Sequence, residues 1–213
     1  KMGTSVRKTS AKIRKLLQDS LNENPKISVD EVVPKVAGGT LKAKKTKEYF
    51  GDKDFTILVG CGLSCFRKIA SIGYDDFVRE YEFDPSKVSK VEIQKIIEAI
   101  LEEIEKENGD IQSSFILNAF KLAMTNVLMD KITDPVVFLT HFCELFLDMI
   151  IREEASEELS SAFKEIASDK LDDSILQFTK DYVEQHFSNC ILQCVRGEID
   201  IRQLVAELQK KLK

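Results

Sequence analysis

The sequence has no tryptophan, only four prolines and only nine glycines in 213 residues. This scarcity excludes collagen-like and low-complexity chains, and the absence of any repeat at a fixed period disfavours solenoid architectures. No uninterrupted apolar run approaches the roughly 20 residues that a membrane-spanning helix needs, and the start Met2-Gly3-Thr4-Ser5-Val6-Arg7 lacks the apolar core of a secretory signal. We therefore expect a globular cytoplasmic protein with no membrane segment.

The chain has five cysteines and only two histidines. An odd number of cysteines in a chain of this size indicates reduced thiols in a hydrophobic core rather than a disulfide framework.

Apolar residues make up 43% of the chain and charged residues 31%, a balance typical of folded helical proteins. The net charge of −5 conceals an asymmetry, because residues 1–50 carry a balance of +7 and residues 51–213 a balance of −12. A basic arm beside an acidic body indicates an arm that either lies on its own body or docks on a partner.

The periodicity predicts an all-α fold in three regions: a tail (2–9), a loosely built helical region (10–84) and a helical bundle (85–213). The tail has no periodicity, so we expect it to be extended and flexible. Ile13, Leu16, Leu17 and Leu21 then follow one helical face, with Ser10 as a possible cap.

Within region 10–84, a capping box at Ser28 to Glu31 predicts a short helix that Gly38-Gly39 should end. Residues 41–50 and 55–74 have the least regular pattern. We expect an irregular or β-like segment near residues 54–62, before the glycines that follow Val59.

In the bundle, Ser89 and Asn108-Gly109 delimit one strongly periodic helix, and Asp200 caps a last helix over 200–212. Further segments are predicted at about 111–131, 135–155, 156–168 and 173–196. Residues 135–152 are apolar on nearly all sides, which predicts the central helix of the bundle.

Two patterns suggest ligand chemistry. His186, Cys190 and Cys194 are spaced four residues apart, but residues i and i+8 lie about 12 Å apart along a helix, so one helix cannot direct all three at one zinc ion. Other ligands could come from Cys61, Cys65, His141 and Cys143, yet we favour buried core thiols and expect neither a metal nor a cofactor.

The second pattern is Gly60-Cys61-Gly62, which has the outline of a phosphate-binding loop. The third glycine of a dinucleotide fingerprint is absent, so we favour a bend between packed elements. The acidic pairs Glu102-Glu103, Glu153-Glu154 and Glu157-Glu158 have no nearby histidine in sequence and are predicted to be solvated surface. No catalytic constellation is recognisable, so we do not expect an enzyme.

A cluster of lysines, Lys42, Lys44, Lys45 and Lys47, could neutralise phosphates. However, the aromatic residues Tyr49 and Phe50 follow the cluster instead of being spread through it, as a platform for single strands would require. Nucleic-acid binding through this cluster is an alternative that we do not favour.

The start Met2-Gly3-Thr4-Ser5, the later run Leu63-Ser64-Cys65-Phe66-Arg67-Lys68-Ile69-Ala70 and the pair Gly73-Tyr74 resemble the B component (QatB) of the Qat antiphage defence systems. Proteins of that family have a comparable order of motifs before an all-helical C-terminal half. Here the Gly/Pro-rich stretch that usually follows the start is replaced by the helix-forming residues 10–21.

The resemblance implies a non-catalytic subunit that binds a QueC-like enzyme and other components of the same defence system. Such an enzyme activates a 7-deazaguanine carboxylate with ATP and can pass it to an amine. Because Gly3 is small enough for removal of Met2, its amine is the implied acceptor. Thr4 and Ser5 would enter the active site with it, and Arg7 and Lys8 would guide docking. A generic helical adaptor remains the alternative.

Overall fold

The computed structural model describes the backbone of residues 3–163 and 168–212, and the side chains of residues 10–163 and 169–212. All regular secondary structure in these residues is helical, so the predicted all-α class is confirmed. The helices are α1 (Gly3–Glu23), α2 (Val29–Leu41), α3 (Lys44–Phe50), α4 (Lys53–Ile72), α5 (Tyr74–Glu80), α6 (Lys90–Asn108), α7 (Ser114–Met129), α8 (Pro135–Ala162), α9 (Ser168–His186), α10 (Ser188–Val195) and α11 (Ile201–Lys211).

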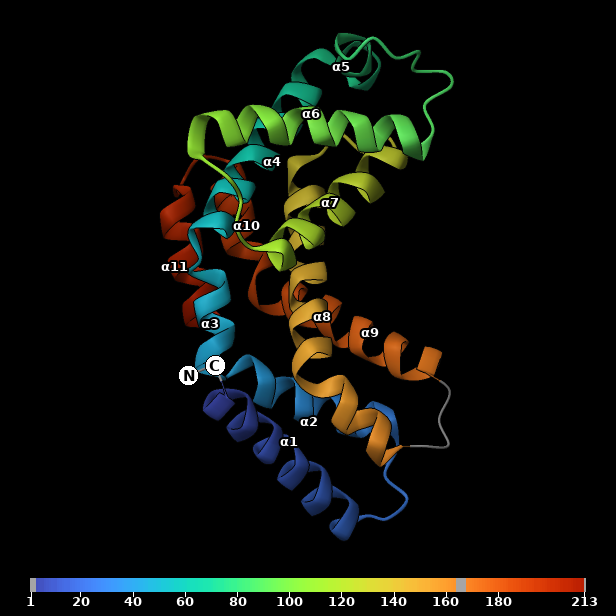
Figure 1. Ribbon diagram of the computed structural model, residues 1–213, viewed down its shortest axis with the longest axis vertical. Helices are drawn as coiled ribbons and strands as arrows, with labels where there is room; N and C mark the ends of the chain where they lie inside the picture. Colours follow the sequence, from blue (N-terminus) through green and yellow to red (C-terminus); the bar gives the residue numbers. More distant parts are fainter. Residues whose placement is uncertain (1–2, 164–167, 213) are drawn as a thin grey trace.

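Helix α8 is the centre of the molecule, as the sequence predicts for residues 135–152. It runs through the middle of the bundle and packs against α1, α2, α4, α7, α9 and α10 (Figure 1). Phe138, Phe142 and Phe146 are fully buried along one face and stack on one another. Asp134 caps the helix and Pro135 occupies its first turn. No proline or glycine follows in it, so α8 absorbs most of the separately predicted segment 156–168.

The prediction of an extended tail over residues 2–9 is wrong from Gly3 onward, because α1 begins at Gly3. Met2 lies outside the described residues. Once a helix is nucleated, each further residue adds a hydrogen bond at little cost, and no proline interrupts residues 3–23. Ser10, predicted as a cap, therefore lies inside α1.

The prediction of a β-like segment at 54–62 is also wrong, because these residues lie within α4. Asp52 caps this helix by accepting a hydrogen bond from the backbone N–H of Asp54 at 2.8 Å. A short apolar run alone does not distinguish a strand from a buried helix. Here the run belongs to a 20-residue helix with a large buried face.

Two other predicted boundaries differ. Helix α2 starts after the Ser28 capping box, as predicted, but it continues through Gly38-Gly39 to Leu41. A Cβ at Gly39 would lie 3.1 Å from Leu16 Cδ1, so glycine here allows α1 to pack closely. The predicted segment 173–196 is divided at Phe187 into α9 and α10. The boundaries at Ser89, Gly109 and Asp200 are confirmed.

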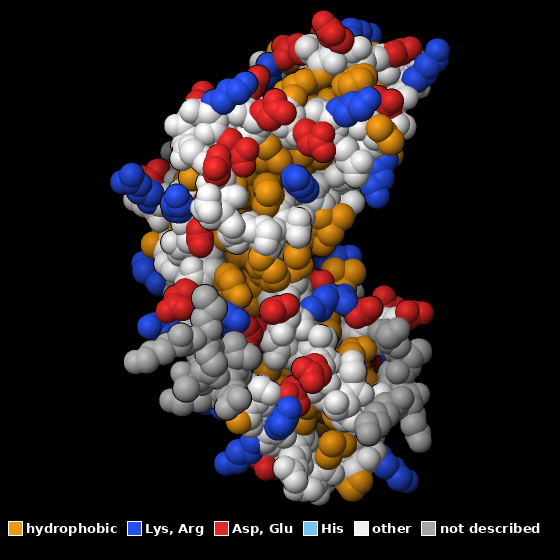
Figure 2. Space-filling model, viewed as in Figure 1, with side chains coloured by type: hydrophobic (Ala, Val, Ile, Leu, Met, Phe, Trp, Pro, Cys, Tyr) orange, Lys and Arg blue, Asp and Glu red, His pale blue; other side chains and the backbone are white. Residues whose placement is uncertain are grey.

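The buried apolar residues form one cluster that runs from Ile13 to Leu212, so regions 10–84 and 85–213 share a core. Hydrophobic side chains also gather in a band across the middle of the face in Figure 2. Of the described helices, α4 alone has the length and composition of a membrane span, and half of that stretch is buried within the bundle.

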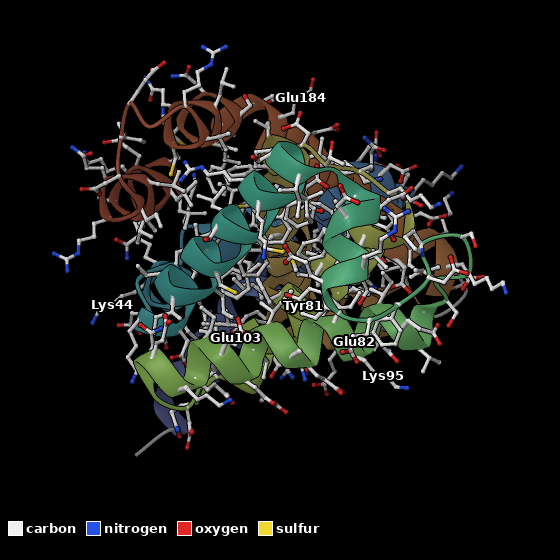
Figure 3. The ribbon with its side chains drawn as sticks, turned by 90° about the horizontal axis from the view of Figure 1, so that it is seen from above. Lys44, Tyr81, Glu82, Lys95, Glu103 and Glu184 are labelled. Carbon is white, nitrogen blue, oxygen red and sulfur yellow. The ribbon has the colours of Figure 1, made fainter. Side chains whose placement is uncertain are left out.

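Helices α5 and α6 cover one end of the bundle. Seen from above in Figure 3, α6 lies across this end, with Lys95 and Glu103 along it and Tyr81 beside it. Burial, with nearby thiols and Glu103 as smaller causes, raises the pKa of Tyr81 to about 12. The predicted division near Pro85 falls in the loop between α5 and α6 and stays a prediction.

Candidate functional site

The basic N-terminal region lies on its own acidic body, through a set of residues that we call the arm contact. It comprises Ser10 and Arg14 of α1, Lys45 of α3, and Glu154 and Glu158 of α8. Arg14 Nε donates to Glu158 Oε2 at 2.7 Å, and the Ser10 hydroxyl donates to Glu158 Oε1. Lys45 Nζ forms an ion pair with Glu154 Oε1.

The two carboxylates of the arm contact are buried. The side chain of Glu154 is 7% exposed and that of Glu158 is 9% exposed. The hydrogen bonds from Arg14 and then Ser10 lower the pKa of Glu158, since both donors favour its charged form. Burial opposes the charge of Lys45, but its hydrogen bonds with Glu154 and Tyr49, together with the attraction of both groups, raise its pKa.

These contacts correct the prediction that every acidic pair is solvated surface. Glu153, Glu157 and the pair Glu102-Glu103 are exposed, as predicted, whereas Glu154 and Glu158 are not. The last two are four residues apart, so they share a face of α8 and point at the arm. Buried carboxylates need partners, and the arm supplies them.

Apolar packing holds α1 beside the same part of α8. Ile13 and Leu17 of α1 are buried, and so are Ala155 and Leu159 of α8. The side chain of Arg14 is largely exposed, so solvent screens its ion pair with Glu158. This ion pair therefore contributes less to stability than the apolar contacts do. The arm contact therefore fixes orientation and register more than it adds stability.

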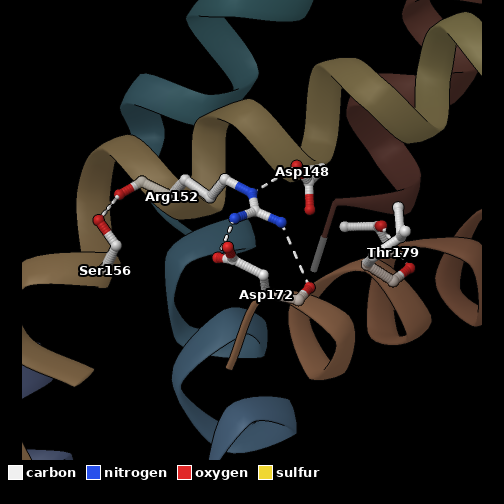
Figure 4. A network of polar contacts seen from close by, with 6 residues as sticks. Asp148, Arg152, Ser156, Asp172 and Thr179 are labelled. Atoms are coloured by element: carbon white, nitrogen blue, oxygen red, sulfur yellow. Dashed lines mark hydrogen bonds and ion pairs between the residues drawn. The ribbon is translucent and has the colours of Figure 1, made fainter. Parts of the chain in front are cut away.

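A second ionic network lies on the same helix and holds α9. Arg152 Nε donates to Asp148 Oδ2 at 2.6 Å, and the same guanidinium binds the carboxylate and the carbonyl oxygen of Asp172 (Figure 4). Asp148 Oδ1 is buried and has no hydrogen-bond partner in the described part of the chain. Acidic and basic groups of α8 thus tie both α1 and α9 to the central helix.

The predicted acceptor Gly3 and the predicted tail residues Thr4, Ser5, Arg7 and Lys8 lie on the first two turns of α1. Their side chains are outside the described residues. Ser10 is the first residue of α1 with a described contact to the body, seven positions after Gly3. At 1.5 Å per residue, the backbone of Gly3 is about 10 Å further along the helix axis.

The body takes up one lysine of the cluster, and the others have exposed or backbone contacts. Lys45 is paired with the buried Glu154 and lies over the Tyr49 ring. Lys44 forms an exposed ion pair with Glu48 at 3.2 Å, and Lys42 is the C-cap of α2. The backbone carbonyl of Lys47 accepts a hydrogen bond from Gln209 Nε2 at 2.7 Å. The segment carrying these lysines is a structural link to α8 and α11.

The expectation of buried thiols is confirmed for all five cysteines, which are free. Burial raises the pKa of Cys61 and of Cys65 to about 12 and that of Cys143 well above its ordinary value. His186 is exposed at the end of α9, before the bend that separates it from Cys190 and Cys194. No group of three or more His, Cys, Asp or Glu residues in the described chain is arranged to hold a metal ion.

Gly60-Cys61-Gly62 is neither a phosphate-binding loop nor a bend, since it lies in the middle of α4. Gly62 allows α4 to pack closely against α8. A Cβ at this position would lie 2.1 Å from Cε1 of Phe138, so α4 and α8 approach closely only with glycine.

In α4, residues that carry the family resemblance have structural roles. Leu63, Phe66 and Ile69 are buried. Arg67 Nη2 donates to the carbonyl oxygens of Cys194 and Val195, at 3.2 and 3.1 Å, and so satisfies the end of α10.

The rest of the pattern joins α4 to α5. Lys68 forms an ion pair with Glu80, and Gly73 turns the chain with a φ of +89°. This part of the pattern therefore stabilises the packing of α4 against α5 and α10.

Sequence reasoning missed the buried role of Glu154 and Glu158. The charge balance of +7 in residues 1–50 indicates that the arm has an acidic partner. The signal that could have located this acidic partner is the four-residue spacing of Glu154 and Glu158, which places both on one helical face near Ala155, a residue that the structure shows to be buried. The chain matches no protein-family model, and comparisons with curated proteins and with solved structures gave no match.

Proposed function

We propose that the protein is a non-catalytic subunit of an antiphage defence complex, which binds a QueC-like enzyme and offers the amine of Gly3 for 7-deazaguanine-type modification. The observation that supports this is how α1 is held. Ser10 and Arg14 of α1 bind Glu158 of α8, and Gly3 lies seven residues before Ser10, about 10 Å further along the helix axis. The resemblance supplies the partner class.

The chemistry requires little from this chain. Once Lys1 and Met2 are absent, the neutral amine of Gly3, with an unperturbed pKa of about 8, attacks the carbonyl carbon of the adenylated carboxylate held by the enzyme. The N–C amide bond forms, the bond from carbon to the AMP oxygen breaks, AMP leaves, and the amine releases a proton to solvent. On this proposal the protein contributes the nucleophile and its position, and the enzyme contributes activation.

The helical start of α1 changes how the tail would enter an active site. A narrow channel accepts an extended segment, so the first two turns of α1 have to unwind on binding. Terminal turns of a helix open at low cost because they have the fewest hydrogen bonds to lose. Arg7 and Lys8 would then guide docking to an acidic entrance.

A comparison of two glycine substitutions tests this proposal. Gly3→Leu blocks a narrow channel, so the QueC-like enzyme should no longer increase the mass of the protein. Gly38→Leu is the matched control, because no atom lies within 4 Å of a Cβ at Gly38. Both variants should remain helical by circular dichroism. Modification of the Gly3→Leu variant at the control's rate would refute the proposal.

The alternative is a generic helical adaptor, whose body binds a partner while the first turns of α1 are incidental. Deletion of residues 3–9 distinguishes the two functions and leaves the arm contact in place. If the protein is a substrate, the deletion ends modification. If it is an adaptor, co-purification with the partner is unchanged and no mass increase occurs in either form.

The nucleic-acid alternative is weakened by the pairing of Lys45 with Glu154. It predicts an affinity that falls steeply with salt and depends on Lys42, Lys44 and Lys47.

A further inference from the structure

The exposed stripe of α7 has no charged residue. It consists of Ser114, Asn118, Leu122, Asn126 and Met129, which follow one another at helical spacing and are all exposed. Charged residues make up 31% of the whole chain, so a solvent-facing helix would ordinarily carry several, whereas α7 has only Lys121, which is half-buried. Depletion of charge on an exposed face is typical of protein interfaces.

Large apolar side chains are exposed on this stripe and beside it. Leu122 and Met129 are 45% and 42% exposed, and Val137 of the neighbouring helix α8 is 38% exposed. Helices α7 and α8 pack against each other. Between them lies a cleft of about 310 Å³, to which Asn126 contributes from α7 and Val136, Val137 and His141 contribute from α8. We call this cleft and its flanking apolar residues the α7/α8 groove.

A row of polar side chains crosses the groove. Asn126 Nδ2 lies 3.0 Å from His141 Nε2, within hydrogen-bond distance. His141 Nδ1 lies 3.3 Å from Glu144 Oε2, a long hydrogen bond. The side chain of Glu144 is 15% exposed. The row therefore ends on a carboxylate that retains capacity to accept from a further donor.

The charge of the groove has one sign. Its lining includes the acidic residues Asp130 and Glu144 and no lysine or arginine. A partly buried carboxylate beside apolar walls favours a cation that also has an apolar stem, which describes a lysine or arginine side chain. The occupant that fits is therefore apolar and basic at once.

We propose that the α7/α8 groove binds an amphipathic helix of a partner protein, with a lysine or arginine directed at Glu144. Leu122 and Met129 are seven residues apart, or about 10 Å along α7. This length matches two turns of a docked helix, whose apolar residues at i, i+3 or i+4, and i+7 would cover Leu122, Met129 and Val137. This inference does not depend on Gly3 or on the arm contact.

Selection of a phage-displayed library of amphipathic helical peptides on the folded full chain tests the proposal. Enriched peptides should have an apolar stripe interrupted by lysine or arginine. Synthetic copies should bind the Leu122→Gln and Met129→Gln variants about tenfold more weakly than the wild type, because each variant loses apolar burial. Leu16→Gln is the matched control, since Leu16 is 39% exposed on α1 and lies far from α7.

Glu144→Gln tests the charge separately. It should remove the preference for a peptide with the central lysine over the same peptide with glutamate at that position. Unchanged thermal melting of all variants confirms that they fold.

Three outcomes would overturn the proposal: no enrichment, enriched peptides that bind Leu122→Gln and Met129→Gln as tightly as the wild type, or a wild-type dimer that these two substitutions dissociate. The last outcome would assign the groove to a second copy of the chain.

Discussion

Replacement of Gly62 by alanine should destabilise the protein, although alanine is the better helix former. The added Cβ would lie 2.1 and 2.3 Å from Cε1 and Cζ of Phe138. That ring is fully buried and stacks on Phe66 with centroids 4.8 Å apart. It cannot move away without disturbing the core around α8.

The magnitude follows from two opposing effects. Overpacking a well-packed core typically costs about 1–3 kcal/mol, and alanine in place of glycine in a helix returns about 1 kcal/mol. The free energy of unfolding should therefore fall by up to about 2 kcal/mol, which lowers Tm by up to roughly 8 °C in a domain of this size.

Gly38→Ala is the matched control, because Gly38 also lies inside a helix but has no atom within 4 Å of its added Cβ. It should be neutral or stabilise the protein by up to about 1 kcal/mol. Urea unfolding followed by circular dichroism measures both variants. A Gly62→Ala variant as stable as Gly38→Ala would refute the close approach of α4 to α8.

Other consequences of the structure can be measured directly. Glu158→Gln should increase amide hydrogen exchange in α1 about five- to tenfold at neutral pH. Because the folded state lowers the pKa of Glu158, this contact stabilises at neutral pH and is lost as pH falls through the lowered value. The variant and the wild type should therefore exchange alike in acid, and a difference that persists there would contradict the assignment. Cys61 and Cys65, with pKa raised to about 12, should resist iodoacetamide at pH 8 until the chain unfolds, so rapid alkylation of the native protein would contradict their burial. Asp54→Ala should lower the free energy of unfolding by about 1–3 kcal/mol in a urea titration. The reason is that Asp54 Oδ2 accepts hydrogen bonds from the backbone N–H groups of Gln112 and Ser113. An unchanged urea midpoint would contradict that role.

The helix periodicity predicted much of the fold. Ser89, Gly109 and Asp200 mark their helix ends through local rules of capping, which depend on a few neighbouring residues. The central position of α8 follows from the apolar character of residues 135–152. Such features need no knowledge of the rest of the chain.

The wrong predictions at glycines have a common physical cause. Local sequence favours breaks at Gly38, Gly39, Gly60 and Gly62 because glycine is a poor helix former, but two of these positions serve close contacts between helices, at Leu16 and Phe138. Contacts of that kind depend on tertiary packing and are invisible in local sequence.

The candidate site shows the same division between local and distant information. Charge asymmetry predicted that the basic arm could lie on its own body, and the arm contact confirms this. The choice of Glu154 and Glu158 over neighbouring acidic residues requires the orientation of α8. Likewise, Asp54 reaches Gln112 and Ser113 across 58 and 59 residues, a distance that no local pattern spans.

The most direct test of the proposed function is the intact mass of the untagged protein, purified from the cells that naturally make it and compared with the same protein expressed alone. The proposal predicts a mass increase only in the first sample, mapping to Gly3 on peptide analysis. A Gly3 terminus with no mass increase in either sample would contradict it and leave the helical adaptor as the function to pursue.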